Sequence, residues 1–510
     1  MKRALISVYD KEGIVEFALS LKKLGWDIIS TGGTYKLLRD NDIHVFEVDE
    51  ITKFKEILDG RVKTLNPRIH GGILFKRDNI EHRKTIEDLG ILPIHMVVNN
   101  LYPFEETVKK VGVSHEEIIE NIDIGGPSMI RAAAKNYNDV TVVIDPKDYN
   151  LILAELIKEG ETSFNTREYL AAKVFSYTSY YDSLISNYFN QLVNVKFPDY
   201  LTLSYKKKDE LRYGENPHQE ASIYVEPSID SGSILNGEKL HGKELSYNNI
   251  NDGNAAISII KEFDKPTAVA IKHANPCGVA CGDTILEAYK KAYECDSESI
   301  FGGIVALNRQ VEEDLARELN KIFLEIIIAP SFSEEALKVL TNKKNIRLIK
   351  LEDISLPYKK TLDFKKIQGG LLVQDKNQDM FKDEMEIASI LSPDDQDIEE
   401  LIFAWKVAKH ITSNGVVISK DEATLGIGLG EVNRFFAVEG AIKRAGDRSK
   451  DAYLASDGFF PFSDSIEALS KAGIKAIIQP GGSLKDGEVI DKANEEKMIM
   501  VLTGIRHFKH

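Results

Sequence analysis

Short apolar runs alternate with amphipathic stretches through the N-terminal part of the chain, and this alternation limits the folds open to it. The apolar runs at 3–8, 26–30, 44–48, 96–102 and 139–145 have the length of buried strands. Residues 13–25 and 34–42 have the spacing of amphipathic helices. Strands that alternate with helices form a mainly parallel sheet with helices on both faces, and its ligands bind at the carboxyl ends of the strands.

The same alternation returns in the C-terminal part, after a break. Strands are predicted at 266–273, 302–308, 325–330, 414–419, 452–457 and 475–483, and helices at 285–294, 312–323, 399–411 and 466–473. The break, 194–219, holds two prolines and a run of three lysines. Because 510 residues are too many for one hydrophobic core, we predict domains at 1–198 and 199–510, the second built from two α/β subdomains.

Charge and cysteine content exclude several classes of protein. A net charge of −15 argues against a nucleic-acid binder, which needs a basic face for phosphates. No stretch approaches the roughly 18 uninterrupted apolar residues of a membrane span. Three cysteines cannot form a disulfide framework and fit a reducing compartment, so we predict a cytoplasmic protein.

Four motifs of the first domain could hold an anion or move protons. STGGT at 30–34 follows a strand and opens a helix, where backbone N–H groups can cradle a phosphate. The other three supply cations, a phenol, an amide and a carboxylate: GRVKTL (Arg61, Lys63, Thr64), NLYPF (Asn100, Tyr102) and IDIGG with RAAAKN (Asp123, Gly125, Gly126, Lys135). Each motif alone also fits an ordinary turn, a solvated basic loop or a helix end.

Lys272 and His273 lie at the end of an apolar strand in KHANPCGVAC, which also contains a broken metal motif. Zinc deaminases combine H-x-E with P-C-x-x-C. Here Cys277 and Cys281 have C-x3-C spacing, and no H-x-E precedes them. We therefore predict no metal site, two buried cysteines, and a Lys–His pair as either a catalytic site or a plain charged strand terminus.

Two further loops are rich in polar residues or glycine. LRYGENPHQ at 211–219 has little apolar content, so it is either a binding loop or an exposed linker. LGIGLGEVNR at 425–434 is not G-x-G-x-x-G and lacks a suitable acidic residue about 20 positions on, so it is not a dinucleotide site. We interpret it as a glycine-rich turn before a helix.

Taken in order, these motifs resemble one family: the bifunctional enzymes with 5-aminoimidazole-4-carboxamide ribonucleotide (AICAR) transformylase and inosine monophosphate (IMP) cyclohydrolase activities. FGGIVA, IIAP, TSNGVV, SDGFFPF, QPGGS and the terminal RHFKH also match, so the resemblance covers the chain from residue 7 to residue 510. It implies a methylglyoxal-synthase-like first domain and a transformylase domain of two cytidine-deaminase-like subdomains. It also implies a homodimer, with the transformylase site across the subunit interface.

The resemblance implies a formyl transfer from 10-formyltetrahydrofolate, as cosubstrate without a tightly bound cofactor, to the 5-amino group of AICAR. That amine is a poor nucleophile. The resemblance implies that His273 would take its proton, and that Lys272 would stabilise the oxyanion or help to protonate the leaving nitrogen. Asn414 would orient the carboxamide. Substrate-binding positions would be Arg212, Tyr213, Gly302, Glu325, Arg434, Asp457, Phe459, Phe460 and His510.

The resemblance implies a second reaction, in which formyl-AICAR loses water and closes to IMP without a metal. Lys63, Tyr102, Asp123 and Lys135 match the family's catalytic group. Substrate contacts would come from the anion turn, from Arg61 and from neighbouring loops: Ser30, Gly32, Gly33, Thr34, Thr64, Asn100, Gly125 and Gly126. The chain departs from the family pattern at Asn66, Glu431 and Asn433, where His, Gln and Ser are usual.

Two alternatives stay open at this point. The first domain could be a non-catalytic anion sensor attached to a transformylase, although a sensor would not need Lys63, Tyr102, Asp123 and Lys135 together. A zinc deaminase is the other alternative. The leading hypothesis is a phosphoribosylaminoimidazolecarboxamide formyltransferase and IMP cyclohydrolase of purine biosynthesis.

Overall fold

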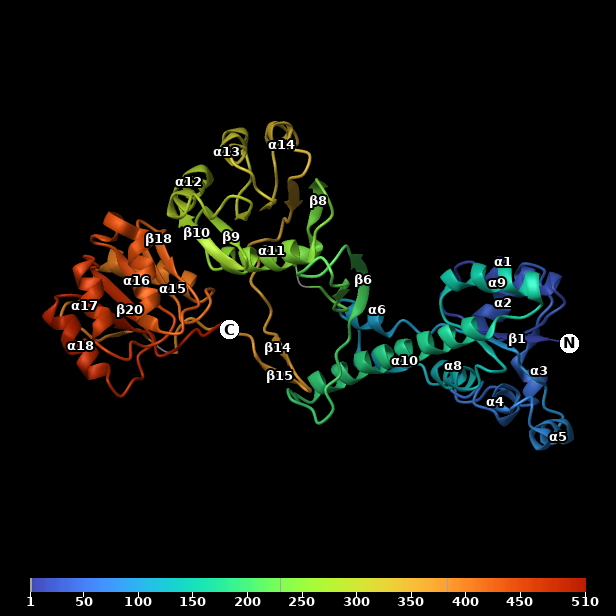
Figure 1. Ribbon diagram of the computed structural model, residues 1–510. Helices are drawn as coiled ribbons and strands as arrows, with labels where there is room; N and C mark the ends of the chain where they lie inside the picture. The colour runs from blue at the N-terminus through green and yellow to red at the C-terminus, as the bar shows by residue number, and fades with distance from the viewer. Residues whose placement is uncertain (1, 230, 383) are drawn as a thin grey trace. The chain divides into compact units, whose positions relative to one another are not determined.

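The computed structural model describes residues 2–229, 231–382 and 384–510, which divide into two compact units (Figure 1). The first unit contains Met1–Lys206 and Glu226–Ser228. The second contains Lys207–Val225 and Ile229–His510. No helix among the described residues is both long enough and apolar enough to cross a membrane.

Over its described residues the first unit has one parallel five-stranded sheet, in the order β3-β2-β1-β4-β5. The strands are β1 (Arg3–Ile6), β2 (Asp27–Ser30), β3 (Phe46–Glu47), β4 (Met96–Val98) and β5 (Thr141–Val143). The predicted apolar runs are confirmed as strands, each shorter than its run. The strand order reverses between β1 and β4, which is where a parallel sheet leaves a crevice for ligands.

Helices cover both faces of this sheet. In Figure 1, α1 (Ile14–Lys23) and α9 (Tyr149–Glu159) pack together on one side, and α4 (Pro67–Leu74) and α8 (Gly125–Lys135) on the other. The 29-residue helix α10 (Phe164–Leu192) packs on α8 and β5. The remaining elements are α2 (Gly32–Asp40), α3 (Val48–Thr52), α5 (Ile80–Asp88), α6 (Phe104–Lys109), α7 (His115–Glu120) and η1 (Pro146–Asp148).

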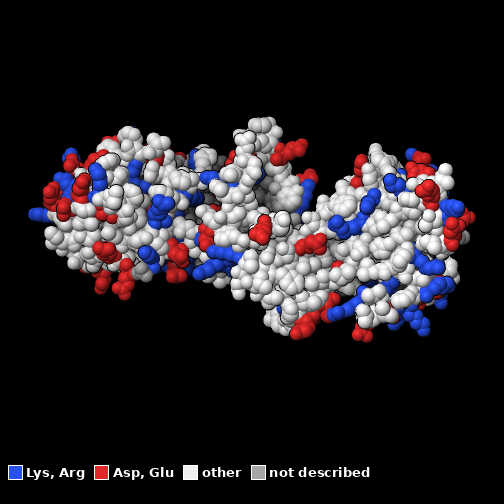
Figure 2. All heavy atoms as spheres, turned by 90° about the horizontal axis from the view of Figure 1, so that it is seen from below, with Lys and Arg blue, Asp and Glu red and all other residues white. Residues whose placement is uncertain are grey.

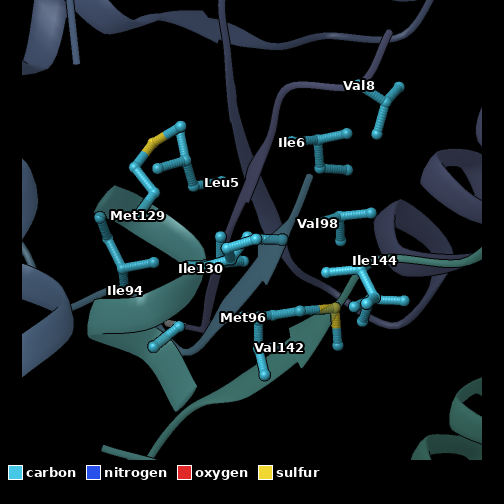
Figure 3. Close-up of a cluster of buried hydrophobic side chains, with 14 of the residues drawn as sticks. Leu5, Ile6, Val8, Ile94, Met96, Val98, Met129, Ile130, Val142 and Ile144 are labelled. Carbon is cyan, nitrogen blue, oxygen red and sulfur yellow. The ribbon is translucent and has the colours of Figure 1, made fainter. Parts of the chain in front are cut away.

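The core of the first unit forms where strands and helix α8 meet. In Figure 3, Leu5 of β1 lies beside Met129 of α8, whereas Ile6 of β1 and Val98 of β4 lie on the other side of the strands. All four side chains are at most 2% exposed. Packing of this kind fixes the strand ends, and therefore the loops that follow them, relative to one another.

Within the described residues of the second unit, two halves with the same order of elements share one twelve-stranded sheet. Each half runs helix, strand, strand, helix, strand, helix, strand, helix, strand. The first half is α11 (Tyr247–Ile260), β9 (Thr267–Lys272), β10 (Asn275–Cys281), α12 (Ile285–Cys295), β11 (Ile304–Leu307), α13 (Glu313–Leu319), β12 (Ile326–Ala329), α14 (Glu334–Leu340) and β13 (Arg347–Lys350).

The second half repeats this order after residue 394. It is α15 (Asp395–Ala408), β17 (Val416–Lys420), β18 (Ala423–Gly428), α16 (Arg434–Ala445), β19 (Tyr453–Ser456), α17 (Asp464–Lys471), β20 (Ala476–Gln479), α18 (Asp486–Glu495) and β21 (Ile499–Leu502). The halves join through antiparallel β10 and β18, where Ala280 pairs with Ala423. The prediction of two α/β subdomains is confirmed.

Short elements complete the second part of the chain. Strands β8 (Glu238–His241) and β16 (Glu386–Ile387) lie at the two edges of the large sheet. Where the chain is described, two separate hairpins are β6 (Lys206–Leu211) with β7 (Ala221–Val225), and β14 (Leu362–Ile367) with β15 (Gly370–Asp375). Short 3-10 helices are η2 (Ile234–Asn236) and η3 (Gly446–Ser449). Acidic and basic side chains are interspersed over the face drawn in Figure 2.

The interpretation of 425–434 as a turn is wrong for its first part, because 425–428 belong to strand β18. The reason is close packing of strand against helix. A Cβ on Gly426 or Gly428 would collide with backbone carbonyls of α16. The glycines therefore allow helix α16 to approach the sheet, and only residues 429–433 form the loop before it.

Candidate functional site

A cavity of about 820 Å³ lies at the carboxyl ends of β1, β2 and β4 in the first unit. It therefore opens at the point where the strand order reverses, as expected for a parallel sheet. Eleven of the predicted site residues line it: Gly32, Gly33, Thr34, Arg61, Lys63, Thr64, Asn100, Tyr102, Asp123, Gly125 and Gly126. The sheet thus brings together residues as far apart in sequence as Ser7 and Met129.

The anion turn forms one wall of this cavity. Helix α2 begins at Gly32, whose φ of 56° is the left-handed conformation that favours glycine. Thr34 fixes the turn against β1, because its hydroxyl donates to the Val8 carbonyl at 2.9 Å and accepts from the Val8 N–H at 3.1 Å. The helix N-terminus thus presents backbone N–H groups and its partial positive charge to the cavity.

Two ion pairs hold the predicted cations at the rim. Lys63 contacts the Glu56 carboxylate, and the guanidinium of Arg61 contacts Glu120. All four residues line the cavity. The Lys63 side chain is 19% exposed, whereas that of Arg61 is 66% exposed. Lys63 is therefore the better-fixed charge, while Arg61 remains free to turn toward an anion.

Asp123 is the partly buried acid of the cavity. Its Oδ1 accepts from the Gly126 N–H at 2.8 Å. Burial raises the pKa of the Asp123 carboxyl, and backbone hydrogen bonds oppose that shift. Burial, followed by the Asp123 charge, raises the pKa of the Tyr102 phenol, while Lys63 lowers it. A carboxyl, a phenol and an ammonium that influence one another electrostatically form a group suited to proton transfer.

Two predicted residues of the first unit do not line the cavity. The Ser30 side chain is fully buried, and its hydroxyl donates to the Ile6 carbonyl at 2.8 Å. Lys135 is the last residue of α8, whereas Gly125, at its first turn, faces the cavity. Ten helical residues separate the two ends by about 15 Å. The structure therefore does not bring Lys135 together with Lys63, Tyr102 and Asp123.

Sequence reasoning missed several residues that line the cavity. Lys11 follows β1, and burial lowers the pKa of its ammonium. Asn99 is 4% exposed, and its Nδ2 donates to the Ser7 carbonyl at 2.5 Å. Glu56 and Glu120 pair with the cations. The position of Lys11 just beyond a strand end could have identified it from the sequence. Glu56 and Glu120 do not follow a strand, so no sequence pattern marks them as site residues.

In the second unit, Lys272 and His273 lie at the tight turn between β9 and β10. His273 is exposed, and the Lys272 ammonium donates to the Phe301 carbonyl at 3.0 Å. Gly302 follows Phe301 directly, and its N–H donates to the Phe323 carbonyl. Glu325 lies close by, because its N–H donates to the Gly303 carbonyl. The predicted positions at 272, 302 and 325 are therefore neighbours.

The same turn is joined to residues 412–414. The Asn275 Oδ1 accepts from the hydroxyl of Thr412 at 2.8 Å and from its backbone N–H at 3.2 Å. Two residues on, Asn414 accepts from Arg434 at 2.7 Å and donates to the Glu431 carbonyl at 2.9 Å. Lys272, His273, Asn414 and Arg434 thus belong to one connected region.

Asp457 links several groups of this region. It is fully buried, pairs with Arg434 at 2.5 Å, and accepts from Gly415 N–H at 3.1 Å and from the Ser413 hydroxyl. The C-terminal segment is tied in as well, since the His507 N–H donates to the Asp457 carbonyl at 2.9 Å. A buried charge pair with this many hydrogen bonds acts by fixing the groups around it.

The remaining predicted residues are less tightly connected. Phe459 is half-buried and Phe460 fully buried. His510 packs edge-on against Phe508, near the chain end. The Arg212 guanidinium lies 5.5 Å from the Tyr213 ring centroid. The loop that follows Arg212 and Tyr213 reaches α11 through a 3.2 Å hydrogen bond from Asn248 to the Glu215 carbonyl.

The cysteines lie apart from any ligand cluster. A β-bulge between Pro276 and Gly278 leaves Cys277 unpaired in the β9–β10 ladder. As a result Cys277 and Cys281 pack into different core clusters of the second unit. Burial raises the pKa of Cys277 to about 12 and that of Cys281 to about 11. Over the described part of the chain, no three His, Cys, Asp or Glu side chains gather as metal ligands.

Comparison with known proteins gives consistent matches over the whole chain. A family model described as AICARFT/IMPCHase bienzyme matches residues 133–444, and an MGS-like domain matches 13–128. The bifunctional purine biosynthesis protein PurH of Caldicellulosiruptor saccharolyticus is 57% identical, over 100% of both chains. The PurH proteins of Thermoanaerobacter sp. and Bacillus subtilis are 56% and 53% identical, again over 100% of each chain.

Proposed function

The chain belongs to the AICAR transformylase/IMP cyclohydrolase bienzyme family, and from this premise we propose a division of labour between its two units. It is a bifunctional enzyme of purine biosynthesis that formylates AICAR and closes the product to IMP. We assign ring closure to the first unit and formyl transfer to the second. The cavity that gathers Lys63, Tyr102 and Asp123 is the observation that carries this assignment.

Ring closure needs an acid and a base close to one carbon atom. The carboxamide nitrogen of formyl-AICAR attacks the formyl carbon, and the former carbonyl oxygen takes up a proton. Loss of that hydroxyl as water, with the proton of the formylated nitrogen, completes the double bond of the ring. The partly buried Asp123 and Tyr102 exchange these protons, and the Lys63 ammonium stabilises negative charge on the oxygen.

The 5′-phosphate of the nucleotide is assigned to the anion turn. The N-terminus of α2, with Gly32, Gly33 and Thr34, offers backbone N–H groups, and Arg61 can leave Glu120 to reach the phosphate. Thr64, Asn100, Gly125 and Gly126 line the rest of the cavity. Lys135 and Ser30 stay predictions of the sequence, without a contact in this cavity.

Formyl transfer is assigned to the exposed turn of the second unit. His273 takes the proton of the AICAR amine as that nitrogen attacks the formyl group of 10-formyltetrahydrofolate. Lys272 stabilises the oxyanion of the tetrahedral intermediate. Asn414 orients the substrate carboxamide, and Asp457 holds Asn414 through Arg434. The residues proposed to bind substrate around them are Arg212, Tyr213, Gly302, Glu325, Arg434, Phe459, Phe460 and His510.

Substitution of His273 tests the assignment of formyl transfer. We expect His273→Ala to lower the rate of formyl transfer at least 100-fold while ring closure of supplied formyl-AICAR stays within twofold of the wild type. Both rates are measured on one preparation by nucleotide chromatography. An equal loss of both activities in a folded protein would contradict the division of labour.

Substitution of Asp123 tests the assignment of ring closure against the anion-sensor alternative. That alternative is not favoured, because the relatives are named as bifunctional over their full length. We expect Asp123→Asn to stop ring closure and to let formyl-AICAR accumulate from AICAR and 10-formyltetrahydrofolate. If Asp123→Asn closed the ring at the wild-type rate, the first unit would be left with a binding role only.

We further propose that the enzyme acts in the cytoplasm as a homodimer, with free AICAR, formyl-AICAR, IMP and folate as its ligands and neither nucleic acid nor membrane as a partner. Large apolar side chains are exposed after helix α10, notably Val193, Phe197 and Tyr200, at 62%, 60% and 87%. Exposed large apolar side chains gathered in one short segment support a subunit interface there. Sedimentation of the 57.2 kDa chain should give twice that mass, and a monomer would contradict the proposal.

A further inference from the structure

The turn that carries His273 has a backbone conformation that its residues disfavour. Lys272 pairs with Asn275 across the β9–β10 ladder, so His273 and Ala274 form a two-residue loop. Their φ angles are 53° and 59°. A loop with two left-handed residues is usually built from Asn and Gly, because a Cβ is crowded there. Something outside the turn must therefore stabilise it.

Asp252, on the neighbouring helix α11, supplies this stabilisation. Its Oδ1 accepts from the Ala274 N–H at 2.8 Å, and the carboxyl group also accepts from the His273 backbone. Burial raises the pKa of Asp252, which those two hydrogen bonds oppose. One carboxylate from a different element thus contacts both left-handed residues of the turn.

The second half of the same unit repeats this arrangement. Asp421 and Glu422 form the two-residue turn between β17 and β18, with φ angles of 54° and 49°. Glu400 of α15 accepts from the Glu422 N–H at 3.0 and 3.2 Å through its two oxygens. Asp252 stands five residues after the first residue of α11, and Glu400 five after that of α15.

The two turns differ in position. The Glu422 carbonyl accepts from Cys281 at the C-terminal end of β10, whereas His273 precedes the N-terminal end of that strand. Six residues of strand separate these ends by about 20 Å. Each half of the unit therefore has a helix carboxylate that accepts hydrogen bonds from a two-residue turn. Of these two carboxylates, Asp252 is the one beside Lys272 and His273.

We propose that Asp252 is a positioning residue for formyl transfer: by holding both backbone N–H groups of the His273–Ala274 turn, it places the His273 imidazole against the AICAR amine. This inference rests on the proposed role of His273 in proton removal. It predicts an effect on kcat with little effect on KM, because Asp252 acts through the backbone and not on the substrate.

Four variants separate positioning from general stability. Asp252→Ala removes the acceptor, Asp252→Asn keeps an acceptor oxygen without the charge, and Asp252→Glu keeps the charge but shifts it by one methylene. Glu400→Ala is the matched control, because it removes the equivalent carboxylate from the other turn. For each variant, kcat and KM of formyl transfer, the rate of ring closure and Tm are measured on the full-length protein.

We expect Asp252→Ala to lower kcat of formyl transfer at least tenfold, with KM values and ring closure within twofold of the wild type. Asp252→Asn should retain more activity than Asp252→Glu, which shows that geometry matters more than charge. Glu400→Ala should lower Tm without lowering kcat. Ala274→Gly, which relieves crowding in the turn, should restore part of the kcat lost in Asp252→Ala.

The proposal is overturned if Asp252→Ala and Glu400→Ala have the same kcat, or if Asp252→Glu is as active as the wild type while Asp252→Asn is not. Should Asp252→Ala fail to accumulate, the comparison of Asp252→Asn with Asp252→Glu decides alone. His273→Ala is measured alongside. Loss of transfer in His273→Ala with normal Asp252 variants refutes only the positioning role, whereas an active His273→Ala refutes the role of His273 itself.

Discussion

At the scale of single residues, the cysteines of KHANPCGVAC show how one inserted residue decides a local environment. Cys277 and Cys281 are four positions apart, a spacing that places both side chains on one face of a regular strand. The bulge at Cys277 breaks that alternation, and the two thiols enter separate core clusters. Packing is therefore the role that their surroundings support.

This environment predicts inert thiols. Burial raises the pKa of Cys277 to about 12 and those of Cys281 and Cys295 to about 11, so almost no thiolate is present at pH 8. We expect a disulfide reagent to label the native protein at least 100-fold more slowly than the unfolded chain, and Cys277→Ala to keep both activities. Rapid labelling accompanied by loss of formyl transfer would contradict this expectation.

Gly126 is a second position where one atom matters. A Cβ there would lie 2.5 Å from Asp123 Oδ2, 2.8 Å from Leu101 Cδ2 and 2.9 Å from Asn99 Oδ1. Gly126→Ala should therefore displace the Asp123 carboxyl and slow ring closure roughly 10- to 100-fold. Formyl transfer by the same protein is the control, and unchanged ring closure would show that the carboxyl does not need this position.

At the scale of elements, Asn66 and Asn433, two residues that depart from the family pattern, are N-caps of helices. The Asn66 side chain accepts from the Arg68 N–H at the start of α4, and that of Asn433 from the Phe435 N–H at the start of α16. Asparagine is among the best N-cap residues, so both positions retain a structural role. Glu431 instead contributes its carbonyl to the Asn414 amide, which any residue can do.

Helix α15 also carries a group that titrates near neutral pH. Burial raises the pKa of Glu400 to about 7, above that of an unfolded chain, so the folded state binds the proton more tightly. The stability that this group contributes is complete below the unfolded pKa and is lost as pH rises through about 7.

Glu400→Gln tests this titration, because glutamine keeps an acceptor oxygen for Glu422 without the buried charge. We expect Tm of the variant to exceed that of the wild type at pH 8 by a few degrees, with the difference shrinking toward pH 5. Calorimetry at several pH values gives both curves. Parallel curves over this range would mean that Glu400 does not titrate there.

At the scale of the whole molecule, the division into two compact units predicts separable activities. Residues 1–206 contain the complete parallel sheet, its helices and every residue that lines the cavity. We expect this fragment to close supplied formyl-AICAR and to lack formyl transfer. Circular dichroism verifies that it is folded, and a folded fragment without ring closure would contradict the assignment of that step to the first unit.

The sequence by itself determined the α/β class, most of the strands and the motifs at their ends, because apolar periodicity and turn residues are local properties. It also predicted two α/β subdomains in the second domain, but not the full order of elements that repeats from α11 to β13 and from α15 to β21, since backbone topology repeats without a sequence repeat. No local pattern encodes the order of strands in a sheet. That order decides which strand-end motifs lie next to one another.

The sites show the same limit. The family resemblance grouped Lys63, Tyr102 and Asp123, and these three residues line one cavity. Only the tertiary structure showed that Lys135 is a helix length away and that Lys11, Asn99 and Glu56 line the cavity. It alone showed that Asp252, 21 residues before His273, holds its turn. Such contacts depend on crossovers and helix packing, which join residues that sequence spacing keeps apart.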